Sequence, residues 1–139
     1  LSPRQDAQTV DVAGYLRALC ASIEQQVENV AIEIEADEVA LSIERAVPLG
    51  LIVNEAATNS VKHAFAGKAG RIFVRLQAGV GFGEGRLVVT DDGSGFEKRE
   101  SSGSGLKLIE SLARQIGGQV LIESSRNGTS TSVTFPIIG

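Results

Sequence analysis

One stretch of the chain gathers side chains that can bind a metal ion and phosphate groups. It runs from Asn54 to Phe65 and reads NEAATNSVKHAF, within a longer segment of helical periodicity. On a helix that turns ~100° per residue, Glu55, Asn59 and Lys62 fall on one face, with His63 beside them. Carboxylate and amide oxygens are ligands that Mg²⁺ accepts directly or through water. Glu55 and Asn59 are therefore suited to bind Mg²⁺, and Lys62 is suited to neutralise phosphate charge.

The same helix also fits a simpler interpretation. Solvated helices often carry polar residues four positions apart, and an imidazole near a helix end can hydrogen-bond the last carbonyl groups. No second histidine or cysteine lies near His63 in the sequence, so we reject a zinc site. Taken alone, the segment favours a solvated helix face, and the metal hypothesis depends on the rest of the chain.

A second segment, from Asp91 to Phe96, reads DDGSGF and follows an apolar run that predicts a strand. Asp91 would end this strand at the rim of the core, where its carboxylate could accept a hydrogen bond from the exocyclic amine of adenine. Guanine has a carbonyl there, so the site would favour ATP over GTP, because two facing acceptors stay unpaired. Gly93 and Gly95 would let the backbone turn beneath the base. A simple turn is the alternative interpretation.

A third segment, from Gly103 to Lys107, reads GSGLK and opens a predicted helix. Free backbone amides and the helix dipole favour an anion at such an end, and Lys107 adds positive charge one turn later. The segment is not a Walker loop, because no Gly-Lys-Ser or Gly-Lys-Thr ends it. A flexible loop with Ser104 as the helix N-cap is the alternative.

Length and composition favour one domain and limit the kinds of partner. A chain of 139 residues with 42% apolar content can build one ordinary core. The net charge is −4 and the basic residues are scattered, so we expect no nucleic-acid partner. No apolar run is long enough to span a bilayer, so we expect a cytoplasmic domain without membrane contact. Cys20 has apolar neighbours at helical spacing, which predicts a buried thiol.

The periodicity predicts an alternation of helices and strands. We expect helices at 10–28, 44–66 (with Pro48 in its first turn) and 104–116, and strands at 30–35, 39–43, 71–77, 86–90, 120–124 and 131–137. Residues 79–85 indicate a hairpin connection, and Asn127-Gly128 a two-residue turn. This order predicts a two-layer α/β sandwich, with about three helices on one face of a mixed sheet of about five strands. The other face of the sheet would be half solvated.

Together, the three segments resemble the N box and the two glycine boxes of the GHKL superfamily of ATP-binding domains. Within it, the chain is similar to the catalytic domain of bacterial sensor histidine kinases, of the HWE group or its sister group, whose N box also reads Lys-His-Ala-Phe. The HWE group is partly named for a tryptophan, and this chain has none, so the sister group is the better match. Residues 48–52 and 128–136 fit the same pattern, so the resemblance covers nearly the whole chain.

The resemblance implies a Bergerat-type ATP-binding fold and a role for each matched residue. Asn59 would coordinate Mg²⁺, and Glu55 would hold a metal-bound water or help to polarise the acceptor. Lys62 and His63 would contact the phosphates. The adenine amine would bind Asp91, with Thr129 taking part through water. The remaining matched positions would shape the base pocket and the phosphate end of a short lid at 97–102: Gly93, Gly95, Gly103, Gly105, Leu106 and Lys107.

The resemblance also implies partners. Kinases of this family transfer the γ-phosphoryl group to a histidine on a separate dimerising helical domain, whereas His63 would belong to the ATP site. Because the chain starts at Leu1 rather than at Met, we expect a fragment, with residues 1–9 as a linker remnant from that upstream helical domain and 10–139 as the ATP-binding catalytic domain. The histidine-bearing dimerisation domain and a downstream response regulator would be its partners.

Two alternatives share the fold. An anti-sigma-factor serine kinase is often a single domain of about this size, and a non-catalytic interaction module could keep the fold without turnover. The amphipathic helix at 10–28 and the Lys-His-Ala-Phe sequence favour the histidine kinase. Asn59, Asp91 and both glycine segments argue against a module that has lost turnover.

Overall fold

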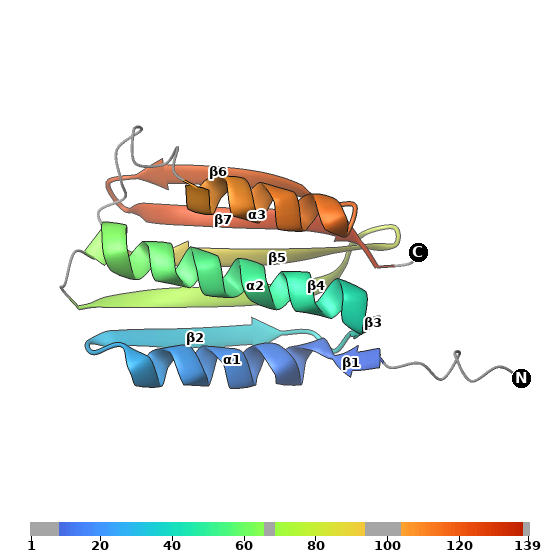
Figure 1. The fold of residues 1–139 in the computed structure, drawn as a ribbon, viewed down its shortest axis with the longest axis horizontal. Coiled ribbons are helices and arrows are strands. Elements are labelled where there is room, and N and C mark those ends of the chain that lie inside the picture. The colour runs from blue at the N-terminus through green and yellow to red at the C-terminus, as the bar shows by residue number, and fades with distance from the viewer. Residues whose placement is uncertain (1–8, 66–68, 94–103, 138–139) are drawn as a thin grey trace, which may run out of the picture.

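The computed structural model describes residues 9–65, 69–93 and 104–137. Three α-helices cover one face of a five-stranded sheet, which makes a two-layer sandwich (Figure 1). Along the chain the elements are β1 (Thr9–Asp11), α1 (Val12–Gln26), β2 (Val30–Ala36), β3 (Ala40–Ser42), α2 (Ile43–Asn59), the π-helix η2 (Ser60–Phe65), β4 (Gly70–Gly81), β5 (Glu84–Asp91), α3 (Ser104–Gln115), β6 (Gln119–Ser125) and β7 (Gly128–Pro136). The predicted architecture is confirmed.

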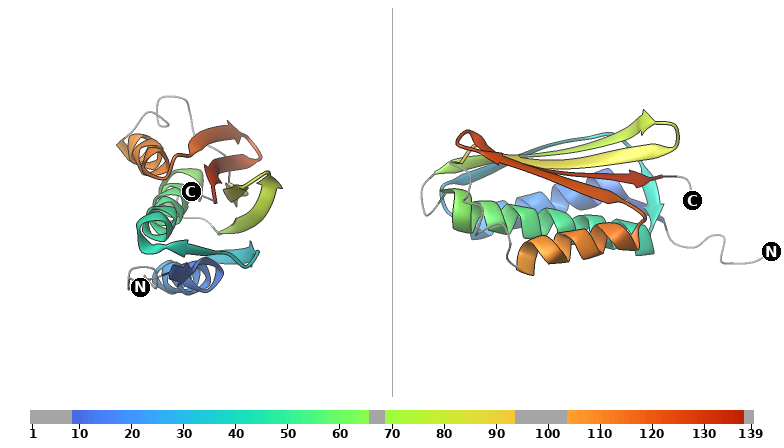
Figure 2. Two further views of the ribbon diagram at one scale, coloured as in Figure 1. Left: turned by 90° about the vertical axis from the view of Figure 1, so that its right-hand side faces the viewer. Right: turned by 90° about the horizontal axis from the view of Figure 1, so that it is seen from above.

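The sheet is mixed, as the sequence predicts. Its strand order is β2-β4-β5-β7-β6, in which β2 and β4 run parallel and the other neighbours antiparallel. A separate antiparallel pair, β1 and β3, lies at the start of α1 and α2. The two further views show all the helices on one side of the sheet and the other side open (Figure 2). Any site on this fold must therefore use the covered face, the open face or one end of the sandwich.

Strand alternation divides the sheet into these two faces. In β4, Ile72 and Val74 are buried under the helices, whereas Arg71, Phe73 and Arg75, which alternate with them, are exposed. In β5 the alternation places Val89 and Asp91 inward and Thr90 outward. The open face is thus half solvated, and the last residue of β5 points toward the helical layer.

Helix α2 lies at the centre of the helical layer, between α1 and α3 (Figure 1). The sequence correctly places Val53 and Ala57 on its packed side, since both are fully buried. The prediction that Pro48 lies in the first turn of the helix is wrong, because Pro48 lies inside α2. The helix begins at Ile43, one residue earlier than predicted, and the burial of the residues around Pro48 compensates for the lost backbone hydrogen bond.

The second predicted helix is not one continuous α-helix. Its α-helical part ends at Asn59, and residues 60–65 form a π-helix. At this junction the backbone N–H of Ser60 donates to the carbonyl oxygens of both Ala56 and Ala57. A π-helical turn holds one more residue than an α-helical turn, so it changes the direction of every side chain that follows, and such turns are frequent at functional sites.

Two turn positions also differ from the predictions. Ser125 pairs with Gly128, so the β6–β7 turn consists of Arg126 and Asn127, one residue earlier than expected. The hairpin between β4 and β5 is confirmed but narrower than predicted, with Phe82 and Gly83 at its tip. Gly128 is the first residue of β7, and its backbone lies directly against the end of β5.

Among the described residues, no helix is long and apolar enough to cross a bilayer.

Cys20 is buried in α1, as predicted, with 2% of its surface exposed. Removal from water disfavours the thiolate, and the negative charge of Glu24 adds to this effect. Together they raise the pKa of the Cys20 thiol from 9.0 to about 11. The thiol therefore behaves as a small apolar side chain rather than as a nucleophile.

We predict that the native protein resists thiol labelling. At pH 8, an aromatic disulfide reagent should label Cys20 at least about tenfold more slowly in the folded protein than in guanidinium, because the reagent needs an accessible thiolate. Since the folded pKa exceeds the unfolded one, the stabilising effect of the neutral thiol is complete below pH 9 and is lost as the pH rises toward 11. Stability measured over this range should thus fall further in the wild type than in Cys20→Ala. Complete labelling of the folded protein within seconds would contradict the assignment.

Candidate functional site

The carboxylate of Asp91 is the centre of the candidate site. Asp91 is the last residue of β5 and is only 4% exposed. Its Oδ1 accepts hydrogen bonds from the backbone N–H groups of Gly93 (3.0 Å) and Thr129 (3.2 Å), and its Oδ2 accepts one from the hydroxyl of Ser60 (2.6 Å). A buried carboxylate is tolerated only when such donors replace its lost water. These three donors fix the orientation of the carboxylate.

The register of two neighbouring strands brings Thr129 to Asp91. The two residues are directly paired between β5 and β7, although they are 38 positions apart in the sequence. Thr129 is 6% exposed, and its hydroxyl lies 2.9 Å from that of Ser124 on β6. Asp91 and Thr129, which the sequence assigned to one adenine site, are therefore in direct contact.

Gly128 allows this close approach. Its φ angle is 137°, which L side chains rarely adopt, and a Cβ atom there would overlap the backbone carbonyl oxygen of Asp91. The same Cβ would also lie 3.4 Å from the Cα of Asp92. The start of β7 can thus lie against the end of β5 only because residue 128 has no side chain.

Ser60 is the site residue that sequence reasoning missed. Helical spacing places it on the packed side of the helix with Val53 and Ala57, and it is indeed only 6% exposed. Its hydroxyl nevertheless reaches Asp91, which is 31 positions away in the sequence. A single hydroxyl on an otherwise apolar helix side was the available signal, because a buried polar group needs a hydrogen-bond partner.

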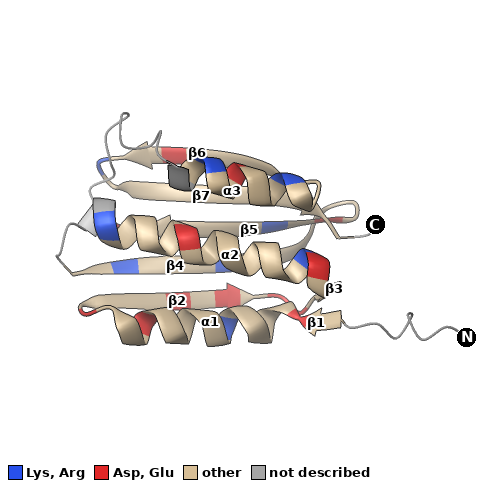
Figure 3. Ribbon diagram, viewed as in Figure 1, with Lys and Arg blue, Asp and Glu red and all other residues tan. Residues whose placement is uncertain are grey.

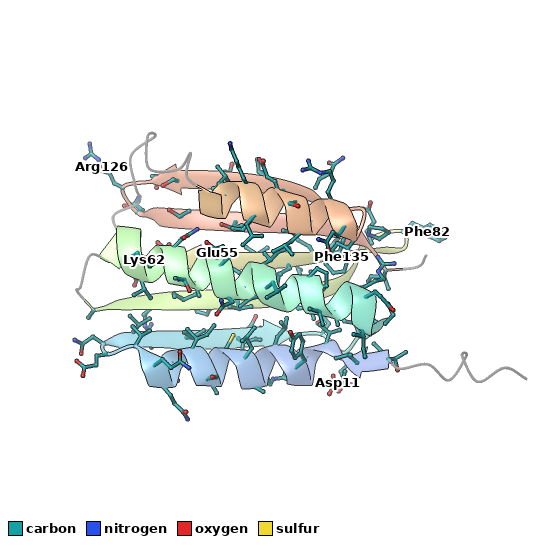
Figure 4. The ribbon with its side chains drawn as sticks, in the orientation of Figure 1. Asp11, Glu55, Lys62, Phe82, Arg126 and Phe135 are labelled. Carbon is teal, nitrogen blue, oxygen red and sulfur yellow. The ribbon has the colours of Figure 1, made fainter. Side chains whose placement is uncertain are left out.

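The residues proposed for metal and phosphate follow one another at the end of the same helix. Glu55 and Asn59 are half-buried, one turn apart, and Asn59 ends α2. Lys62 is exposed in η2, and the side-chain view shows Glu55 and Lys62 along this helix (Figure 4). The backbone of His63 belongs to η2, and its side chain lies outside what the structure describes. Asn59 directly precedes Ser60, so the metal candidate adjoins the donor that holds Asp91.

The third segment begins at the same end of the sandwich. Helix α3 starts beside the end of α2, and the end of β5 lies at the same end of the sandwich (Figure 1). Its first turn contains Gly105, Leu106 and Lys107, of which Leu106 is half-buried and Lys107 exposed. Gly95, Gly103 and the predicted lid at 97–102 lie outside the described residues.

Positive charge at this end comes from single side chains. Basic and acidic residues are interspersed over both layers (Figure 3). Lys62 is exposed in η2, just after the end of α2, and Lys107 is exposed in the first turn of α3. Within the described ranges, no three His, Cys, Asp or Glu side chains gather closely enough to hold a metal ion. A divalent cation beside Asn59 and Glu55 would therefore need oxygens supplied by a ligand or by water.

The chain resembles known histidine kinases in sequence. Residues 44–138 match the family described as histidine kinase-, DNA gyrase B-, and HSP90-like ATPases. Blue-light-activated histidine kinase 2 of Erythrobacter litoralis is 28% identical over 113 residues, which cover 78% of this chain and 32% of the relative. An uncharacterized sensor-like histidine kinase of Chloroflexus aurantiacus is 36% identical over 120 residues, which cover 78% of this chain and 19% of the relative. The chain thus spans a third or less of these relatives.

Solved structures share the fold. The histidine kinase domain of the Erythrobacter litoralis EL346 blue-light activated histidine kinase superposes with a TM-score of 0.83 at 24% identity, covering 92% of this chain and 66% of that one. The mycobacterial sensor histidine kinase MprB superposes with a TM-score of 0.74 at 21% identity, covering 93% of this chain and 97% of that one. At these identities the likeness shows the architecture alone.

We predict that Gly128→Ala disrupts the junction of β5 and β7. The new methyl group would push the backbone of Asp91 away, so the free energy of unfolding should fall by about 3 kcal/mol in urea titrations. Gly79→Ala is the matched control, because Gly79 also has a positive φ (72°) but a Cβ atom added there would meet no other atom within 4 Å. That control should lose only about 1 kcal/mol from backbone strain. Equal losses in the two variants would contradict a steric role for Gly128.

Proposed function

Because the chain belongs to the family of histidine kinase-, DNA gyrase B-, and HSP90-like ATPases, we propose that it is the ATP-binding catalytic domain of a two-component sensor histidine kinase. It would bind ATP with Mg²⁺ and donate the γ-phosphoryl group to a histidine on a separate dimerisation domain. The observation that carries this proposal is the buried Asp91 carboxylate, held by three donors next to the residue pair Asn59-Ser60.

The bonding of Asp91 favours an adenine base. Each carboxylate oxygen can accept about two hydrogen bonds. Oδ1 already accepts two from backbone amides, whereas Oδ2 accepts one from Ser60. One acceptor position is left on Oδ2, and an exocyclic amine is a donor that fits it. Guanine would place a carbonyl oxygen there, so two acceptors would face each other without a hydrogen.

The end of α2 fits Mg²⁺ and phosphate. Asn59 and Glu55 offer hard oxygen ligands, and the phosphates with water would complete the coordination that these two residues begin. Lys62, His63 and Lys107 would neutralise the phosphates, and the backbone at Gly103, Gly105 and Leu106 would approach them at the start of α3. Gly93 and Gly95 would form the floor of the base pocket. Phosphoryl transfer depends on such positioning and charge neutralisation, which Mg²⁺ would supply when bound.

The phosphoacceptor would be supplied by another domain. We propose that residues 1–9 lead from an upstream histidine-bearing dimerisation domain, that residues 10–139 form the catalytic domain, and that a response regulator receives the phosphoryl group afterwards in the cytoplasm. The matched relatives are named as histidine kinases, which supports this function over an anti-sigma-factor kinase of the same fold.

We predict that Asn59→Ala removes the contribution of Mg²⁺ to ATP binding. Calorimetry should show at least about a tenfold loss of affinity with Mg²⁺ and little change in EDTA, because the amide oxygen acts through the metal. Asn54→Ala is the control, since Asn54 is exposed on the same helix and lies ~140° around the helix axis from Asn59. An Asn59→Ala protein that binds ATP with Mg²⁺ as tightly as the wild type would refute the metal assignment.

We predict that Asp91→Asn changes the preference between bases. The asparagine oxygen must face the two backbone amides, so its NH₂ group replaces Oδ2 and meets the adenine amine as a second donor. ATP affinity should fall about tenfold or more and the ATP-to-GTP ratio of affinities should decrease, as measured by calorimetry. Asp92→Asn is the control, because the Asp92 side chain is exposed and accepts from the backbone of Arg71 instead. An unchanged ratio in Asp91→Asn would exclude Asp91 as the adenine reader.

A further inference from the structure

We propose that Ser60 is a positioning residue for base selection: its hydroxyl orients the Asp91 carboxylate so that a single oxygen position faces the exocyclic amine of the base. This inference rests on the proposed ATP site and adds a residue to it. Ser60 lies on the packed side of the helix, opposite the face that carries Glu55 and Asn59, so it does not belong to the proposed metal site.

The geometry of the hydroxyl supports this role. Ser60 Oγ lies 2.6 Å from Asp91 Oδ2 and 3.2 Å from the carbonyl oxygen of Ala56. A hydroxyl has one hydrogen to donate, and the shorter contact, to a charged acceptor, is the stronger one. Both side chains are buried, with 6% and 4% of their surfaces exposed, so little water competes with this bond.

The hydroxyl of Ser60 changes the number of open acceptor positions on Asp91 Oδ2. The two backbone donors on Oδ1 are set by the strand register and by the turn after β5, and they do not depend on any side chain. Ser60 is therefore the only side-chain donor that the described residues provide to this carboxylate. With the hydroxyl, Oδ2 has one open position. Without it, Oδ2 has two, and the carboxylate can turn or take up a water molecule.

The position of Ser60 in the helix adds a second effect. Ser60 follows Asn59 and opens the π-helix that carries Lys62 and His63. Its hydroxyl thus ties the start of the phosphate-side residues to the end of β5, 31 positions away. The base-reading carboxylate and the metal-binding amide are thereby held at a fixed separation, which a nucleotide spanning both would need.

The test compares two triphosphates that differ only in the amine. ATP and purine riboside triphosphate, which lacks the exocyclic amine, would be titrated with Mg²⁺ into the wild type, Ser60→Ala and Ser60→Thr. Ser132→Ala is the matched control, because Ser132 is half-buried on the outward face of β7. Urea unfolding of each variant would measure any loss of stability separately.

In Ser60→Ala, we expect ATP affinity to fall about tenfold while the affinity for the analogue without the amine changes less than twofold, which corresponds to losing one oriented hydrogen bond. Ser60→Thr keeps the hydroxyl and should retain the preference for ATP. A purely structural serine would lower the affinity for both triphosphates equally.

If the wild type binds ATP, two outcomes in Ser60→Ala would overturn the role of Ser60 and leave the ATP site intact. These are equal losses of affinity for the two triphosphates, or no loss of affinity for either. A wild type that binds neither triphosphate would overturn the proposed function and this inference with it.

Discussion

A charge buried in a protein must be surrounded by hydrogen-bond donors, and this requirement at Asp91 determines the arrangement around it. An unpaired buried carboxylate would cost several kcal/mol. Thr129 provides one donor only if β7 begins beside the end of β5, and that approach requires Gly128 to lack a side chain. Ser60 provides another only if the junction of α2 and η2 lies beside the end of β5. The strand register, the glycine and the helix position together bring these donors to the buried carboxylate of Asp91.

The same requirement explains why the site lies at one end of the sandwich. The ends of α2 and β5 and the beginning of β7 meet there, with the first turn of α3 close by. Each of these segments contributes only part of the candidate site. The π-helix begins at the same place, so the change in helical geometry coincides with Ser60, the residue that donates to Asp91.

The sequence predicted the layers, the mixed sheet and the packed side of α2, because burial follows from periodicity. The motifs and their resemblance to a known family predict that Asp91 and the end of α2 belong to one site. Sequence reasoning missed Ser60 as a partner of Asp91, since periodicity tells which side of a helix is buried but not which residue lies opposite. The π-helix was also missed, because it spans only residues 60–65, and six residues are too few to show a change of helical period. The β6–β7 turn was displaced by one residue because Gly128 is needed for an interstrand contact that no local pattern records.

The alternation along β5 has a consequence for how such a chain can change in evolution. Thr90 points outward and Asp91 inward, so substitutions on the open face of the sheet leave the buried carboxylate in place. The outer surface can therefore diverge freely between descendants. An insertion or deletion of a single residue within β5 would instead turn Asp91 toward solvent and place its neighbour under the helices. Lineages of this fold should accordingly tolerate many exterior replacements while keeping the length of this strand constant.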